Sequence, residues 1–152
     1  MRALRGKGLL WVVAGLLACS PAADEVPAAE GPPRARVTIG VHVIDAEIAD
    51  TPARQRRGLS GRKGLAPGEG MLFVYGAPAP RGFWMPDMHF DIDIVWIRAG
   101  RVVHIESRVP HVVSGALPTY RPDEPADTVL EVVAGTAERL GWRVGDRVGI
   151  ER

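Results

Sequence analysis

Apolar and polar residues alternate in short runs along most of the chain, which is the pattern of β-strands with one buried face. Strands are predicted at residues 37–43, 47–49, 68–76, 91–98, 101–108, 128–133 and after Gly145. Two short helices are predicted, one between the cap Thr51 and Gly58, the other between Thr136 and Gly141. Glycines and prolines separate these elements, so we expect one compact, mainly β domain with a barrel-like or sandwich fold.

The runs around Ala99 and Gly100 predict a β-hairpin whose two-residue turn sets the pairing of both strands. This register places Trp96 opposite Val103 and Asp93 opposite Glu106. The predicted core face carries Ile92, Ile94, Trp96, Val103 and Ile105, and the predicted polar face carries Asp91, Asp93, His104, Glu106 and Arg108. A slip of one residue would exchange the two faces, so the core pattern itself favours this pairing.

The polar face of this hairpin is compatible with two interpretations. Asp93, Glu106 and His104 offer two carboxylates and an imidazole, which could serve as metal ligands or as an acid–base pair in a hydrolase-like enzyme. No repeated ligand spacing such as HExxH accompanies them, and a solvated or structural face explains the same residues. The sequence leaves open whether this face binds a metal.

A second group of candidate residues lies outside the hairpin. Trp84 and Met85 stand at a chain bend before Pro86, and they either fill one end of the core or line a small-molecule pocket beside the long loop Pro110–Asp127. Arg62 belongs to a group of five cations between residues 54 and 63. These cations could cradle a phosphate or an acidic lipid headgroup, or simply keep the surface solvated.

The N-terminal segment has the composition of a targeting signal rather than of a fold. Three cations precede an apolar run from Gly8 to Ala18, which is too short to span a bilayer as a helix. The run ends at Cys19, as in the processing signal of bacterial lipoproteins, although an ordinary secretory signal has a similar pattern. We expect a signal peptide at 1–18, a lipidated Cys19 with a disordered Pro/Ala linker at 19–35, and the β domain at 36–152.

Charge and cysteine content restrict the partners of such a protein. The formal net charge is +1, and removal of residues 1–18 would leave −2, so there is no electrostatic case for nucleic acid binding. Cys19 is the only cysteine, which excludes an intramolecular disulfide. We expect an exported protein that faces the periplasm and is anchored through lipidated Cys19; Ser20 after the cysteine favours the outer over the inner membrane.

Several motifs occur in an order that resembles the domain of unknown function 192 family. They are GLSGR (58–62), GEGMLFV (68–74), FWMPDM (83–88), DIVWI (93–97), TVLEVVAG (128–135) and RLGWRVGDRV (139–148). The resemblance covers roughly residues 37–150 and implies a compact, mainly β domain, often exported or membrane-anchored, without an established activity. The sequence departs from the family pattern at Ser60, where a methionine is usual, and at Pro86, Asp87 and Met88, where Lys-Asn-Thr is typical.

These observations together predict an envelope lipoprotein whose β domain binds a small ligand or a protein partner without catalysis. The candidate contact residues are Arg62, Trp84, Met85, Asp93 and Glu131. One alternative is the metal-dependent or acid–base enzyme built on Asp93, Glu106 and His104. Another is a structural or assembly accessory of the cell envelope. No cofactor is expected, because phosphate-binding loops and zinc-spaced histidines are absent from the sequence.

Overall fold

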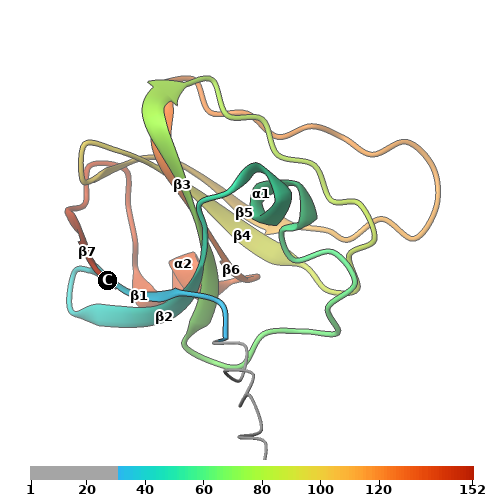
Figure 1. Ribbon diagram of the computed structural model, residues 1–152, viewed down its shortest axis with the longest axis horizontal. Coiled ribbons are helices and arrows are strands. Elements are labelled where there is room, and N and C mark those ends of the chain that lie inside the picture. Colours follow the sequence, from blue (N-terminus) through green and yellow to red (C-terminus); the bar gives the residue numbers. More distant parts are fainter. Residues whose placement is uncertain (1–30) are drawn as a thin grey trace, which may run out of the picture.

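A computed structural model describes residues 31–152 of the protein as a single curled β-sheet with two short helices (Figure 1). The elements are β1 (Arg34–Ile39), β2 (His42–Ala49), α1 (Pro52–Arg57), β3 (Glu69–Ala79), β4 (Ile92–Arg98), β5 (Arg101–Val109), β6 (Ala126–Val133), α2 (Thr136–Leu140) and β7 (Val148–Glu151). The mainly β fold predicted from the sequence is confirmed. The predicted signal peptide, Cys19 and most of the linker lie outside the described residues. Neither helix within 31–152 is long and apolar enough to cross a bilayer.

The seven strands follow the order β5-β4-β6-β3-β2-β1-β7 and curl into a half-barrel (Figure 1). All neighbouring strands are antiparallel except β2 and β3, which α1 connects as a crossover. The turn of the β4–β5 hairpin reaches the chain just before β7, where Val102 N–H donates to Asp146 O and Val148 N–H donates to Gly100 O. These contacts bring the two ends of the sheet together at one corner, without closing a full barrel.

The predicted strand at 37–43 is wrong, because the chain turns at Gly40 and Val41 instead of running on. Gly40 has a φ of 62°, a left-handed conformation that favours glycine, and β2 starts directly afterwards at His42. Val41 is therefore 88% exposed rather than part of the buried face. The alternating pattern continued through a tight turn, so it could not reveal that one strand was two.

Helix α1 begins and ends as the sequence predicted. The Thr51 side chain accepts a hydrogen bond from Arg54 N–H, Pro52 occupies the first turn, and Gly58 ends the helix with a φ of 49°. In α2, by contrast, the cap position is Gly135, and Thr136 is already helical and buried. Both helices are only about a turn and a half long, so contacts with the rest of the fold must hold them.

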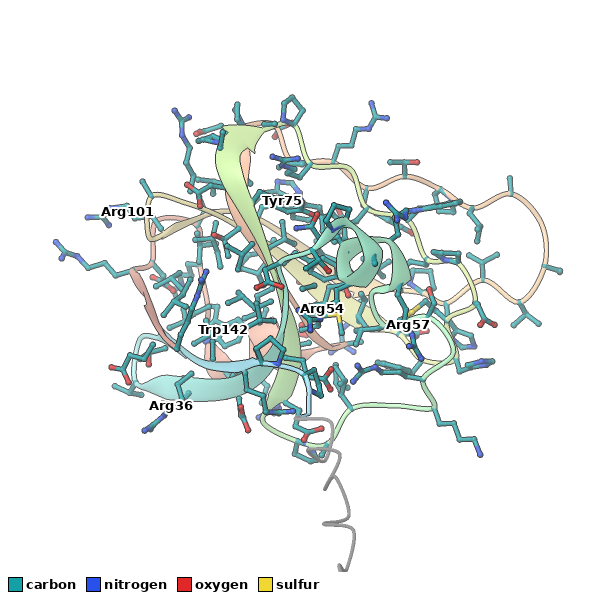
Figure 2. The ribbon with its side chains drawn as sticks, in the orientation of Figure 1. Arg36, Arg54, Arg57, Tyr75, Arg101 and Trp142 are labelled. Atoms are coloured by element: carbon teal, nitrogen blue, oxygen red, sulfur yellow. The ribbon has the colours of Figure 1, made fainter. Side chains whose placement is uncertain are left out.

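Where β3, β6 and β4 lie side by side, both faces of the sheet are buried, and each face carries its own core. One core lies inside the curl with α2 and Trp142; its members include Val37, Ile39, Ile44, Leu72, Val95, Ile97 and Leu130. The other lies beneath α1 and the segment before β4; its members include Leu59, Met71, Phe73, Phe83, Met85, Ile94 and Trp96. Figure 2 shows Trp142 and Tyr75 among the side chains that fill these two regions. Strand β4, between β5 and β6, is consequently buried along both faces, from Ile92 to Ile97.

The predicted register of the β4–β5 hairpin holds only next to its turn. Arg98 pairs with Arg101 and Ile97 with Val102, but a bulge then shifts the ladder, so that Trp96 faces His104. Beyond the bulge, Ile94 rather than Asp93 lies opposite Glu106. The predicted pairing of Asp93 with Glu106 is therefore wrong, and the two carboxylates belong to opposite faces of the sheet.

Candidate functional site

Asp93 is fully buried, and the surrounding backbone satisfies its carboxylate. It accepts hydrogen bonds from Arg108 N–H at 2.8 Å, Gly135 N–H at 2.9 Å and Ala137 N–H at 2.8 Å. Two of these donors, Arg108 and Gly135, have left-handed backbones with φ of 54° and 80°. The carboxylate thus fixes the bulged end of β5 and the first turn of α2, which is a structural task and leaves no acceptor facing a ligand.

His104 and Glu106 do not join Asp93 in a cluster. They lie beside each other at the sheet edge, with 3.7 Å between His104 Nε2 and a Glu106 carboxylate oxygen, and the His104 ring packs at 5.2 Å against Trp96. Within the part of the chain that the structure describes, no three His, Cys, Asp or Glu side chains gather closely enough to hold a metal ion. The geometry does not assemble the acid or metal cluster that the sequence suggested.

Arg62 is engaged by a partner within the fold. Both terminal nitrogens of its guanidinium group donate to Glu47 at 2.6 Å, and this contact lowers the pKa of the Glu47 carboxyl. The pair lines a hollow of about 270 Å³ together with Arg54 and Arg57. Because Arg54 also pairs with Asp50 at 3.0 Å, two of the three guanidinium groups are already neutralised. This hollow is a weaker candidate for a ligand than its arginines alone would indicate.

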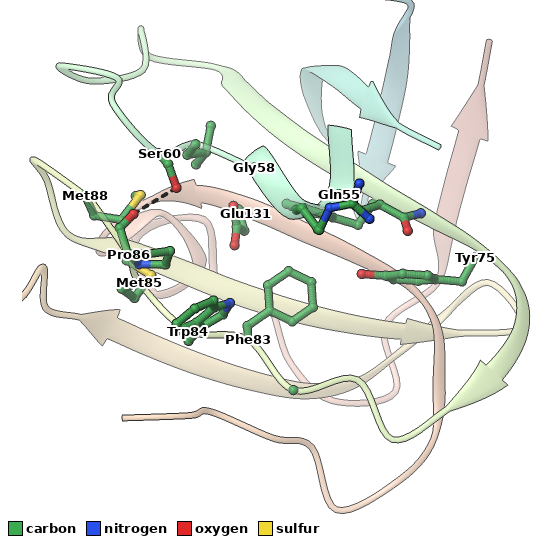
Figure 3. Close-up of a pocket in the computed structure, with 14 residues that line it drawn as sticks. Gln55, Gly58, Ser60, Tyr75, Phe83, Trp84, Met85, Pro86, Met88 and Glu131 are labelled. Carbon is green, nitrogen blue, oxygen red and sulfur yellow. Dashed lines mark hydrogen bonds between the residues drawn. The ribbon is translucent and has the colours of Figure 1, made fainter. Parts of the chain in front are cut away.

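Three of the predicted contact residues do converge, in a pocket of about 90 Å³ between α1, β3, β6 and the 82–88 segment (Figure 3). They are Trp84, Met85 and Glu131. Met85 is buried in the wall, whereas Trp84 is 60% exposed and stands beside the opening. The remaining lining residues are Gln55, Arg56, Gly58, Leu59, Ser60, Phe73, Tyr75, Gly82, Phe83, Pro86 and Met88.

Glu131 is the most unusual group in this pocket. It lies in the middle of β6, between β3 and β4, and only 5% of the residue is exposed. Its neighbours on this face of the sheet are apolar, and burial alone raises the pKa of its carboxyl to about 8. An acid that is mostly protonated at neutral pH is a frequent feature of functional sites, because a folded domain has little reason to bury one in its core.

Tyr75 carries a second polar group into the same space. Figure 3 shows its hydroxyl directed toward the Phe83 ring and the centre of the pocket. Burial raises the pKa of this phenol, the nearby charge of Arg81 lowers it, and the charge of Glu131 raises it. The Arg81 guanidinium group lies over the Tyr75 ring, 3.9 Å from its centroid. Trp96 Nε1–H donates to Arg81 O at 2.8 Å, which anchors the segment before Phe83 to β4.

Ser60 and Pro86 meet at the rim of this pocket. The Ser60 hydroxyl donates a hydrogen bond to Pro86 O at 2.8 Å (Figure 3). The Gln55 side chain attaches α1 to the sheet by donating to Ala49 O at 3.2 Å and to Val74 O at 2.8 Å. Sequence reasoning missed Gln55, Ser60 and Tyr75, since each comes from a different segment and no local spacing marks them.

Comparison with known proteins agrees with the motifs. The profile of the DUF192 family, described as "Uncharacterized ACR", matches residues 35–150. A crystal structure from Sinorhizobium meliloti 1021, described as a candidate transcription regulator, is 34% identical, with 77% of this chain and 92% of that chain covered and a TM-score of 0.66.

A protein of unknown function from Novosphingobium aromaticivorans DSM 12444 is 33% identical, with 87% of this chain and 94% of that chain covered and a TM-score of 0.71. A search of curated proteins finds no match. Since the family profile spans almost all of the described domain, the chain belongs to the DUF192 family.

Proposed function

We propose that this protein binds a small molecule in the pocket around Glu131, without catalysis, and that a lipid on Cys19 holds it at the cell envelope. The observation that carries the first part is the Glu131 carboxyl group, which is buried in the wall of the pocket and accepts no hydrogen bond from any described residue. Buried polar groups normally have a partner, and a molecule bound in the pocket can supply one to Glu131.

The size of the pocket favours a small molecule over a segment of a protein partner. Its volume is about 90 Å³, whereas an engineered cavity of about 150 Å³ binds benzene. The occupant would therefore place only a few heavy atoms inside. Trp84, which is exposed beside the opening, offers an aromatic surface over which a longer molecule could extend.

Tryptophan fluorescence tests ligand binding directly, because Trp84 is the exposed one of the three tryptophans within residues 31–152. We expect members of a library of soluble compounds of about six heavy atoms or fewer to shift its emission and to raise the melting temperature. Trp84→Ala should weaken binding, whereas Val113→Ala, which removes an apolar side chain that is 89% exposed, should not. Failure of every compound to bind the wild-type chain would overturn the proposal.

The anchoring part of the proposal rests on the apolar run that ends at Cys19, outside the described residues. Feeding cells a palmitate analogue should label the wild-type protein in the membrane fraction and leave Cys19→Ser unlabelled and released. Density-gradient separation of the two membranes then tests the outer-membrane location that Ser20 favours. A wild-type protein without label, free of the membrane, would contradict lipidation.

A further inference from the structure

The polar groups left free inside the pocket are mainly hydrogen-bond acceptors. Gln55 uses its amide N–H groups on the carbonyl oxygens of Ala49 and Val74, which leaves its side-chain oxygen free. Ser60 uses its hydroxyl hydrogen on Pro86 O. Once ionised, Glu131 adds two carboxylate oxygens to this set. The Tyr75 hydroxyl, which can donate as well as accept, also points into the pocket, so the three groups above favour, on balance, a ligand that brings hydrogen-bond donors.

The pocket also lacks a counter-charge for Glu131. Among the described residues, no Lys, Arg or His lies within 4.0 Å of its carboxylate. Arg56 lines the opening but is exposed, and Arg81 lies over the Tyr75 ring. No other charged side chain lines the pocket. A positive group on the ligand would supply the missing charge.

The remaining surface suits a cation as well. Phe73, Tyr75, Phe83 and Trp84 contribute aromatic rings, and aromatic faces attract ammonium groups once these leave water. The Arg81–Tyr75 contact shows that one ring of this set already attracts a cation. Acceptors, an unpaired carboxyl group and aromatic walls all point to the same kind of ligand.

On the basis of the function proposed above, we propose that the ligand of this pocket is a small organic cation, a primary alkylammonium group that donates hydrogen bonds to Glu131. An NH₃⁺ group has three donors and no acceptor, which matches the free oxygens of the site. The volume of about 90 Å³ accommodates the ammonium group and a few carbons. A longer remainder of the molecule would lie over Trp84.

Such binding is linked to the release of a proton. The empty pocket holds Glu131 in its protonated form at neutral pH, since its pKa is about 8, and the bound cation stabilises the carboxylate. Burial raises the pKa of the Tyr75 phenol, so Tyr75 stays protonated through this range, and Arg56 and Arg81 are the charged side chains nearest to the pocket. The affinity for the cation should therefore rise with pH until the Glu131 carboxyl is already ionised in the empty pocket.

Calorimetric titration of the full-length chain with propylammonium tests the proposal, with 1-propanol as the neutral ligand of the same size. At pH 7 we expect release of about 0.9 proton per bound propylammonium, measured from the heats in two buffers of different ionisation enthalpy. Affinity should increase about 50-fold between pH 6 and pH 8. Glu131→Gln should bind at least tenfold more weakly and release no proton, whereas Glu151→Gln, an exposed residue of β7, should behave as wild type.

The outcomes separate this inference from the proposed function. If 1-propanol binds as tightly as propylammonium, or if Glu131→Gln binds propylammonium unchanged, the cation inference is overturned, but the pocket still binds small molecules. If neither compound nor any member of the small-molecule library changes Trp84 emission, both proposals fail. Circular dichroism of Glu131→Gln shows that the variant is folded, and Glu131→Asp tests whether a shorter carboxylate restores proton release.

Discussion

Asp93 and Glu131 are two buried acids on neighbouring strands, and their surroundings differ in every respect. In the β4–β6 ladder Asp93 is opposite Val132, and Ile94 is opposite Glu131, so the two carboxyl groups project from opposite faces. Asp93 accepts three backbone hydrogen bonds, whereas Glu131 accepts none from the described residues and borders a pocket. Burial alone therefore does not mark a functional acid.

The difference shows what each face of the sheet does. On the Asp93 face, the carboxylate completes the protein's own hydrogen bonding, so its removal should damage the fold. On the Glu131 face, the carboxyl group accepts no hydrogen bond from the described residues, and its ionisation lowers the stability of the folded protein. A stabilising acid and a destabilising one on neighbouring strands should give opposite responses to mutation.

The largest effect is expected from Asp93→Ala. Three backbone N–H groups would lose their acceptor, which should lower the free energy of unfolding by about 5 kcal/mol. Urea denaturation at pH 7 measures this change. Asp123→Ala, in an exposed position of the long loop, should change the free energy by less than about 0.5 kcal/mol. A similar small effect for Asp93→Ala would show that its hydrogen bonds do not hold β5 and α2.

Glu131→Gln should stabilise the protein at alkaline pH. The unfolded chain releases this proton near the ordinary pKa of 4.5 and the folded chain near 8, so wild-type stability falls as pH rises between these values and levels off above them. The slope due to this group is about −1.4 kcal/mol per pH unit, which amounts to about 4 kcal/mol by pH 8. Urea denaturation from pH 4 to pH 9 should show this slope in wild type and in Glu151→Gln, and its loss in Glu131→Gln. Equal slopes in all three would refute a buried, protonated Glu131.

Trp96→Phe tests how the rim of the pocket is attached to the sheet. The change leaves Arg81 O without the indole N–H and opens a small cavity, so we expect a loss of about 2 kcal/mol. Trp142→Phe is the matched control, because the Trp142 Nε1–H has no hydrogen-bond partner to lose. Thermal unfolding should show the smaller loss for Trp142→Phe. The reverse order would mean that the Trp96–Arg81 contact contributes nothing.

The smallest effect is expected from Arg62→Met, which breaks the ion pair with Glu47. A partly exposed bidentate pair contributes about 1 kcal/mol at neutral pH. Because the pKa of Glu47 is lowered in the folded protein, this contribution is present above the ordinary pKa of 4.5 and disappears as pH falls through the lower folded value. Denaturation at pH 7 and pH 3 measures the difference, with Arg36→Met as an exposed control. A loss that is undiminished at pH 3 would assign the effect to packing instead.

The sequence predicted the elements of this fold better than their pairing. Thr51, Pro52 and Gly58 marked α1, and Ala99-Gly100 marked the hairpin turn, because caps and turns depend on local chemistry. No local sequence pattern indicated the bulge between the Ile97–Val102 and Trp96–His104 pairs. Both faces of β4 are buried, so its apolar residues fit either register, and the alternation that normally selects one was uninformative.

The candidate site was predictable only in part, for the same reason. Trp84, Met85 and Glu131 could be singled out as residues, but nothing in the sequence placed them in one pocket or separated Glu131 from Asp93. That distinction depends on the face of the sheet from which each carboxyl group projects, and on whether backbone N–H groups lie within hydrogen-bonding distance of it. Tyr75 and Gln55 were invisible because their neighbours in space are distant along the chain.

Helix α1 differs from the other walls of the pocket in being nearly free of the core. None of its residues is buried, and the Gln55 amide is its polar attachment to the sheet strands. The remaining walls are β3, β6 and the 82–88 segment, which the hydrogen bond from Trp96 to Arg81 O attaches to β4. Loss of the two Gln55 hydrogen bonds would free α1 from β2 and β3, so one glutamine determines how firmly this wall of the pocket is held.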